Sequence, residues 1–191
     1  MPLIRNEYLP QDMVTVYTSP SGMTDTRTGA PYNMGGLLVG GYFDLTEAEA
    51  QAYGRSQLHE GRYRYVQIDS GATASNIVQG SIGLMKSLAG GVNLITSYDK
   101  GLAAGLRPVV FINAPTAAQV LAGAYVFVQE QGDASLLAAG SIAIGAICQS
   151  QTGGTVVTGG GGTVTALGVA ESAGTNTNLF RAMLNLPIIQ G

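Results

Sequence analysis

Few residues in this chain could do acid–base or nucleophilic chemistry. His59 is the only histidine, so a histidine-based metal site or a Ser-His-Asp triad would have to be built around it. It lies in a polar stretch interpreted as a helix end, where histidine usually serves as a solvated residue favoured by the helix dipole. Cys148 is the only cysteine and is interpreted as a small buried apolar residue. We therefore expect no catalytic, cofactor-binding or metal-binding residues.

One motif keeps an enzymatic alternative open. Residues 68–73 read Ile-Asp-Ser-Gly-Ala-Thr and resemble the active-site loop of aspartic proteases. In that family two such loops place two carboxylates side by side, sharing one proton. This chain has one copy of the motif, so the resemblance implies a homodimer using Asp69 of each subunit. Because Asp-Ser-Gly is also a common turn after a strand, we expect a protein that is not an enzyme.

The composition favours a surface that is covered by other protein. Charged residues make up 11% of the 191 residues, whereas ordinary soluble domains carry about 25%. We expect no membrane span, since no apolar run approaches 18 residues, and no cleaved secretion signal. The net charge of −3, with only Lys86 and Lys100 as lysines, argues against direct nucleic-acid binding. Such a chain is expected to associate with its own copies or with a lattice.

Residues 1–44 are predicted to form an extended arm. Prolines recur about every ten residues, at positions 2, 10, 20 and 31, which forbids a long helix and disfavours a central strand. The segment also holds more tyrosine, valine and methionine than free tails usually tolerate. It should therefore lie on a surface, either that of its own domain or that of a neighbour.

Residues 45–60 are predicted to form one short helix and a linker. Thr46 can accept a hydrogen bond from the amide of Glu49, while the Glu49 carboxylate reaches back to the amide of Thr46, which is a capping box. The helix should end near Leu58, before Gly61.

Residues 61–191 are predicted to form a mainly β domain, either a β-sandwich or a β-barrel. Short β-branched and aromatic runs alternate with Gly, Asn, Asp and Ser at roughly ten-residue intervals. Strands are expected near residues 63–68, 81–87, 92–96, 108–113, 124–130, 141–148, 154–158, 163–170 and 179–185. The segment 155–167, with four glycines in its middle, is interpreted as a hairpin with a plain turn.

Two parts of this domain share a sequence pattern. Residues 61–67 and 123–129 both read Gly-x-Tyr-x-aromatic-Val-Gln, and each is followed some distance on by Gly-Ser-Ile. The two segments could be related β-units packed as a pseudo-symmetric barrel. Alternatively, they could be unrelated strands that converged because their surroundings are similar.

Four segments together resemble small structural proteins encoded beside the major capsid gene in tailed bacteriophages. They are residues 65–74, 96–101, 127–135 and 180–187. The resemblance to these capsid decoration, or cement, proteins implies a β-rich fold with an extended N-terminal arm that binds the outer surface of the shell and stabilises it. The first 60 residues, including the helix, fall outside the resemblance.

The resemblance also implies partners and a location. The expected partners are the major capsid protein and copies of the chain itself, with a trimer as one option, and the expected location is the capsid exterior after assembly in the host cytoplasm. Tyr8, Tyr17 and Tyr32 of the arm are the hypothesised capsid contacts, because aromatic residues dominate interface hot spots. Packing of these tyrosines on their own β domain is the alternative. Another virion component, such as a tail, collar or adhesion module, is the alternative function.

Overall fold

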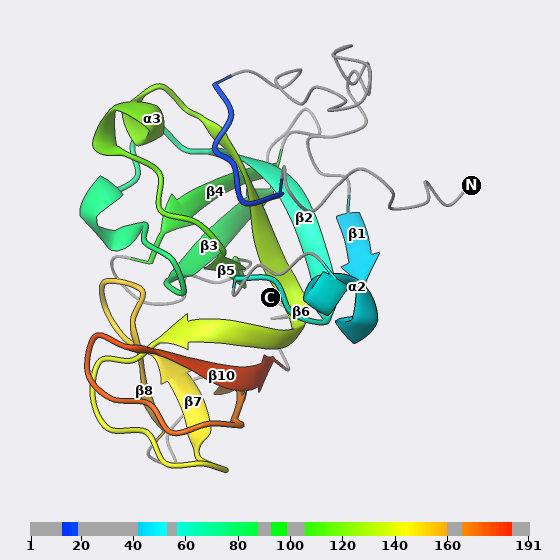
Figure 1. The fold of residues 1–191 in the computed structure, drawn as a ribbon. Helices are drawn as coiled ribbons and strands as arrows, with labels where there is room; N and C mark the ends of the chain where they lie inside the picture. Colours follow the sequence, from blue (N-terminus) through cyan, green and yellow to red (C-terminus); the bar gives the residue numbers. More distant parts are fainter. Residues whose placement is uncertain are drawn as a thin grey trace.

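The computed structural model describes residues 13–18, 42–52, 57–87, 93–98, 106–159 and 166–184. As predicted, the fold is mainly β. The strands are β1 (Tyr42–Leu45), β2 (Gly61–Ile68), β3 (Ile82–Ser87), β4 (Asn93–Ser97), β5 (Arg107–Phe111), β6 (Tyr125–Leu137), β7 (Ile147–Ser150), β8 (Val156–Thr158), β9 (Ala166–Ala170) and β10 (Leu179–Leu184). The helical elements are α2 (Glu47–Ala52), η1 (Ala74–Asn76) and α3 (Ala117–Leu121) (Figure 1).

Five strands close into a barrel. β2 pairs in parallel with β4, and antiparallel pairs then link β4 to β3, β3 to β5, β5 to β6, and β6 back to β2. Each of the five strands is therefore paired on both sides. The interior is filled by side chains that alternate along the strands, such as Val66 and Ile68 of β2 and Val126 and Val128 of β6.

β6 belongs to two layers. Its first part pairs with β2 in the barrel, and residues 132–137 pair with β10. β9, β7 and β8 follow β10 in spatial order, all antiparallel. These four strands and the last part of β6 are called the second sheet, which lies below the barrel in Figure 1. The change of partner occurs at Gly132, whose φ is +92°.

The second sheet packs one face against the outside of the barrel. Apolar side chains of the second sheet meet those of β3 and β5 in one buried cluster. Its larger members are Ile82, Leu84, Val110, Leu136, Leu167 and Phe180. This shared core joins the barrel and the second sheet, and Cys148 is buried within it, as the sequence predicts.

The two segments of shared sequence pattern pair with each other. In the antiparallel register, Tyr65 lies opposite Phe127, and Gln67 lies opposite Tyr125. Tyr65 and Phe127 hold equivalent positions of the pattern and lie opposite each other, with ring centroids 4.8 Å apart. The two segments are therefore related by a local two-fold axis through this pair. These aromatic residues point out of the barrel.

Part of the predicted arm covers this aromatic face. The backbones of Tyr17 and Tyr125 exchange two hydrogen bonds, of 2.9 and 2.7 Å, and Met13 is fully buried against the same cluster. At the end of the predicted arm, residues 42–45 form β1, which pairs with β2. The strand β1 was missed because it is short and stands alone in the sequence.

The capping box predicted at the first helix is confirmed. The Thr46 amide donates to a Glu49 carboxylate oxygen over 2.8 Å, and the Glu49 amide donates to the Thr46 hydroxyl over 3.3 Å. A second capping box, of Thr116 and Gln119, begins α3, a helix that the prediction omitted. The Thr-x-x-Gln signature of α3 was present in the sequence.

The nine predicted strands each overlap one of β2 to β10, but two details were wrong. Of the predicted strand 141–148, only residues 147–148 lie in β7, whereas Ile142 makes an isolated bridge to Gly174 and residues 144–145 form a turn. Segments 156–158 and 166–170 do not pair as a hairpin. Instead, β7 lies between them, with Cys148 opposite Thr158 on one side and Gly168 on the other. The turn residues between β8 and β9 did not reveal that β7, which precedes both strands in the sequence, would lie between them.

Candidate protein-interaction surface

The second sheet has an outer face that points away from the barrel. Along β10 the side chains alternate strictly between the two faces. The buried residues are Phe180, Ala182 and Leu184, and the exposed ones are Leu179, Arg181 and Met183. A solvent-facing sheet surface normally carries polar residues, so the exposed apolar ones on this face are informative.

Three apolar residues line up across the outer face. Ile147 of β7 lies directly opposite Val169 of β9, and Val169 lies directly opposite Met183 of β10. Directly paired residues of neighbouring strands share a face, with their Cβ atoms about 5 Å apart. Their exposed fractions are 52%, 47% and 46%, respectively. Ile147, Val169 and Met183 are called the apolar row.

An internal ion pair borders the apolar row. Asp133 of β6 lies opposite Met183, and its carboxylate forms an ion pair with Arg181. The Asp133 side chain is almost fully buried, whereas the Arg181 side chain is half exposed. The charges of Arg181 and Asp133 therefore compensate each other within the chain.

The linker residues just before β2 contact β6 at the edge of the outer face. His59 Nε2 lies 2.8 Å from the Ser135 hydroxyl of β6, and the Asp133 amide donates to the Glu60 carbonyl over 2.9 Å. Burial lowers the pKa of His59, and the nearby Arg181 lowers this pKa further. The imidazole is therefore neutral at neutral pH. His59 thus acts here as a contact between linker and sheet.

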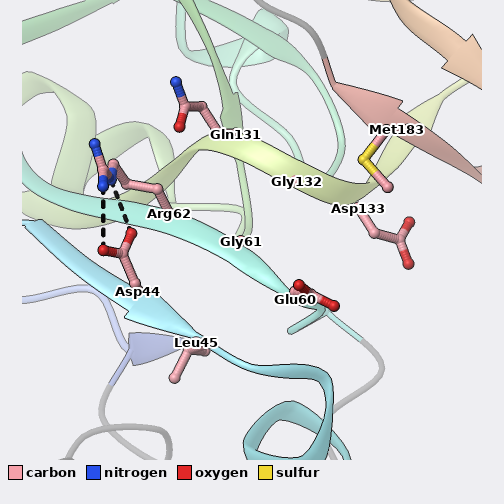
Figure 2. Close-up of a pocket in the computed structure, with 9 residues that line it drawn as sticks. All are labelled: Asp44, Leu45, Glu60, Gly61, Arg62, Gln131, Gly132, Asp133 and Met183. Atoms are coloured by element: carbon pink, nitrogen blue, oxygen red, sulfur yellow. Dashed lines mark hydrogen bonds and ion pairs between the residues drawn. The ribbon is translucent and has the colours of Figure 1, made fainter.

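A pocket of about 310 Å³ opens beside Met183 at the junction of the two layers. Figure 2 shows its lining, with Asp44 and Arg62 joined by two hydrogen bonds of 2.8 and 3.1 Å. The other lining residues are Leu45, Glu60, Gly61, Gln131, Gly132 and Asp133. Met183 thus belongs both to this pocket and to the apolar row, so the two features are continuous.

The arm tyrosines proposed as capsid contacts have different positions. Tyr17 is 8% exposed and packs edge-on against Tyr65 at a centroid distance of 6.1 Å. For this residue the structure shows the alternative contact, with its own domain, and a contact of Tyr17 with a capsid stays a prediction. Tyr8 and Tyr32 lie outside the described residues.

The Asp69 motif forms a turn at the end of β2. Asp69 Oδ2 lies 2.5 Å from Lys86 Nζ, and the Gly71 amide donates to Asp69 Oδ1 over 2.9 Å. The hydrogen bond from Lys86 holds the pKa of Asp69 below its usual value. A carboxylate held ionised by a lysine differs from one that shares a proton with a second carboxylate.

The surroundings of Cys148, the other residue considered for chemistry, do not favour reactivity. Burial raises the pKa of the Cys148 thiol to about 11, so the thiolate needed for nucleophilic chemistry is scarce at neutral pH. Within the part of the chain that the structure describes, no three His, Cys, Asp or Glu residues are grouped to hold a metal ion. The described helices are all too short to cross a membrane.

The apolar row was not anticipated from the sequence. A usable signal was present, because residues 166–170 read Ala-Leu-Gly-Val-Ala and are apolar on both faces of their strand. Which residues of β7 and β10 lie beside Val169 depends on strand order, which the sequence pattern does not reveal.

Comparisons with known proteins found similarity among solved structures. No family model and no curated protein matches this sequence. The chain is similar to the N base of the head fiber protein gp8.5 of bacteriophage phi29, with 13% sequence identity and a TM-score of 0.41. The similarity covers 68% of this chain and 98% of that chain. At this level it concerns the course of the backbone only.

Proposed function

We propose that this chain is a virion structural protein that binds the outer surface of a phage capsid and stabilises the shell, without catalysis. The observation that supports the proposal is the apolar row, which exposes about half of each of three large side chains on a sheet face. Exposed apolar groups of this kind mark surfaces that bind other proteins. A charge content of 11% agrees with a surface that is covered in the assembled state.

The binding free energy expected from this surface is small, which suits binding in many copies to a repeated lattice. Full burial of one large aliphatic side chain contributes about 1.5–3 kcal/mol, so completing the burial of three half-exposed ones contributes roughly 2–4 kcal/mol. That corresponds to weak binding by one copy. Many identical copies on one shell would add such contacts through multivalency.

The finer assignment to a capsid decoration protein is supported by where the resemblance falls. Of the four segments that resemble decoration proteins, residues 127–135 run along β6, and residues 180–187 begin in β10. Asp133, Arg181 and Met183 of the outer face lie in these two segments. The resemblance and the candidate surface therefore coincide on the same two strands.

Co-sedimentation with shells tests the proposal. The purified chain is mixed with emptied mature shells of the phage that encodes it, and the mixture is centrifuged. We expect the chain in the pellet, and a chain that stays in the supernatant contradicts the proposal. A chain that pellets with purified tails instead would favour the alternative of a tail or collar component.

The enzymatic alternative has its own test. Wild type and Asp69→Asn are compared in a peptide-cleavage assay at acid pH. Because Lys86 keeps Asp69 ionised, we expect no cleavage by either protein. Cleavage by wild type that is lost in Asp69→Asn would establish the protease and overturn the structural role.

A further inference from the structure

We propose that residues 143–146, the turn that leads into β7, insert into an uncharged apolar depression on a shell subunit. The inference rests on the proposed function and adds a contact that lies outside the apolar row. It follows from an internal repeat in the second sheet, which separates what the fold requires of this turn from what it does not.

Residues 138–150 and 170–182 follow the same backbone course, 32 positions apart. Each segment has an isolated bridge, a two-residue turn and then a strand, which is β7 in the first segment and β10 in the second. The second turn residue is left-handed in both, with φ +80° at Gly145 and +66° at Thr177. The buried positions of the two segments also coincide: Ala138 and Ala170, Ile142 and Gly174, Cys148 and Phe180, and Ser150 and Ala182.

The two segments bond to each other in a reciprocal way. The Gly145 amide donates to the carbonyl of Ala170 over 2.8 Å. Thirty-two positions away in each case, the Thr177 amide donates to the carbonyl of Ala138, again over 2.8 Å. The isolated bridge joins equivalent residues through two hydrogen bonds of 2.9 Å. A local two-fold axis through the bridge therefore relates the segments, and equivalent residues have similar backbone surroundings.

The two turns differ in the polarity of their side chains. Residues 175–178 read Thr-Asn-Thr-Asn, and Asn178 Nδ2 donates to the Thr175 hydroxyl over 2.6 Å. Residues 143–146 read Ala-Ile-Gly-Ala, and Ile144 is 69% exposed where the second segment has Asn176. Since the same turn forms from polar residues, the fold does not require an isoleucine here. An exposed apolar side chain that the fold does not require indicates contact with another molecule.

The charges of the two segments identify the kind of partner. The first segment has no charged residue, whereas the second carries Glu171 and Arg181 at the positions of Ala139 and Gln149. Both charged residues are exposed, so the fold tolerates charge at these positions. A charged partner group placed against the first segment would lose water without gaining an ion pair there. The depression that receives the turn is therefore apolar and uncharged.

The turn lies close to the apolar row along the chain. Ile144 precedes Ile147 of the row by three residues, which is at most about 10 Å of extended chain. One partner surface can therefore reach both the turn and the row. The shell subunit that covers the row in the proposed function is the partner that this proximity favours.

A titration of the chain against emptied mature shells tests the contact. Wild type is compared with Ile144→Asn, which copies Asn176 of the equivalent turn and should keep the same backbone. The matched control is Leu121→Asn, which removes an apolar residue that is 74% exposed on α3 of the barrel. We expect the apparent Kd from co-sedimentation to rise about fivefold or more for Ile144→Asn, because burial of one isoleucine is lost, and to stay unchanged for Leu121→Asn.

Two further variants keep the test decisive. Ile144→Ala removes most of the side chain without adding a polar group, and it should weaken binding while leaving the melting temperature at the wild-type value. Asn176→Ile in the Ile144→Asn background places an isoleucine in the other turn, beside exposed Glu171 and Arg181. It should not restore binding, and restored binding would overturn the inference by showing that any exposed isoleucine suffices.

The outcomes separate this inference from the proposed function. If wild type pellets with shells and Ile144→Asn and Ile144→Ala bind equally well, the turn is not a contact and the proposed function stands. If Leu121→Asn weakens binding as much as Ile144→Asn, the effect is not specific to the turn and the inference is again overturned. Wild type that stays in the supernatant contradicts the proposed function itself, and the inference that rests on it.

Discussion

His59 is one residue through which pH can act on the fold. Its ring contacts Ser135, and Arg181, Glu47 and Glu171 are the charged groups that act on it. Burial, the largest cause, and then Arg181 lower its pKa below the ordinary 6.5, although the two glutamates oppose this effect. The unfolded chain therefore takes up a proton first as the pH falls. The stability contributed by neutral His59 is complete above about pH 6.5 and is lost as the pH falls towards the folded-state pKa.

The pH prediction is checked by urea unfolding of wild type and His59→Gln between pH 7.5 and 5. The unfolding free energy of wild type should decrease with falling pH more steeply than that of His59→Gln. Glutamine removes the titration while keeping a polar group near Ser135. Parallel curves for the two proteins would show that the linker contact does not titrate in this range.

Two neighbouring arginines of β2 make ion pairs of very different burial. Arg64 Nε donates to Glu130 over 2.6 Å, and Glu130 is 2% exposed. Arg62 binds Asp44, and both of these side chains are substantially exposed. Removing the partner of a buried charge costs about 3–5 kcal/mol, whereas an exposed pair contributes about 0–1 kcal/mol.

Arg64→Ala is therefore expected to lower the free energy of unfolding by about 3 kcal/mol, the lower end of that range. Arg107, whose Nη1 is 3.7 Å from the same Glu130 carboxylate, should limit the loss. The matched control Arg62→Ala should change stability by less than about 1 kcal/mol. Denaturant titration measures both, and similar losses for the two variants would mean that Glu130 gains water when Arg64 is removed.

At the scale of elements, the joint in β6 decides how the two layers meet. Gly132 has φ +92°, and a Cβ added there would lie 2.3 Å from the Glu60 carbonyl oxygen. Both the backbone conformation and the close approach of the linker therefore require glycine. The outer face depends on this joint, because the amide of the next residue, Asp133, bonds the same Glu60 carbonyl.

Gly132→Ala should destabilise the protein by at least about 1–3 kcal/mol, the range for a non-glycine residue in a strained conformation, with the steric contact adding to it. Gly140→Ala is the control, since nothing lies within 4 Å of a Cβ there. That change should be neutral or stabilising by up to about 1 kcal/mol. Thermal unfolding followed by circular dichroism compares the two, and an unaffected Gly132→Ala would disprove the steric argument.

At the scale of the whole molecule, one segment of the predicted arm packs on the chain's own barrel. Residues 13–17 pack on the barrel through Met13 and Tyr17, whereas Tyr8 remains a hypothesised capsid contact. Deleting residues 1–12 removes Tyr8 and leaves the packed segment intact. We expect the shortened chain to keep its melting temperature within a few degrees and to lose at least half of its co-sedimentation with shells. Unchanged shell binding would exclude Tyr8 as a necessary contact.

Much of the local structure of this protein could be predicted from the sequence alone. The capping box of Thr46 and Glu49 depends on residues three apart, and the positions of strands depend on short β-branched runs between turn residues. Both signals come from neighbours along the chain, and the structure reproduces the box and an overlap for every predicted strand. The burial of Cys148 followed from its apolar neighbours in the same way.

Strand order was decided only by the tertiary structure. The closure of the barrel needs β2 to meet β6, whose paired residues Tyr65 and Phe127 lie far apart in the sequence. The apolar row likewise needs β7, β9 and β10 side by side, although turn residues suggested that β8 and β9 would pair. Such contacts are selected by burial of the shared core among many possible pairings. For that reason the sequence could predict strands rich in apolar residues, while the structure alone placed Ile147, Val169 and Met183 together on one exposed face.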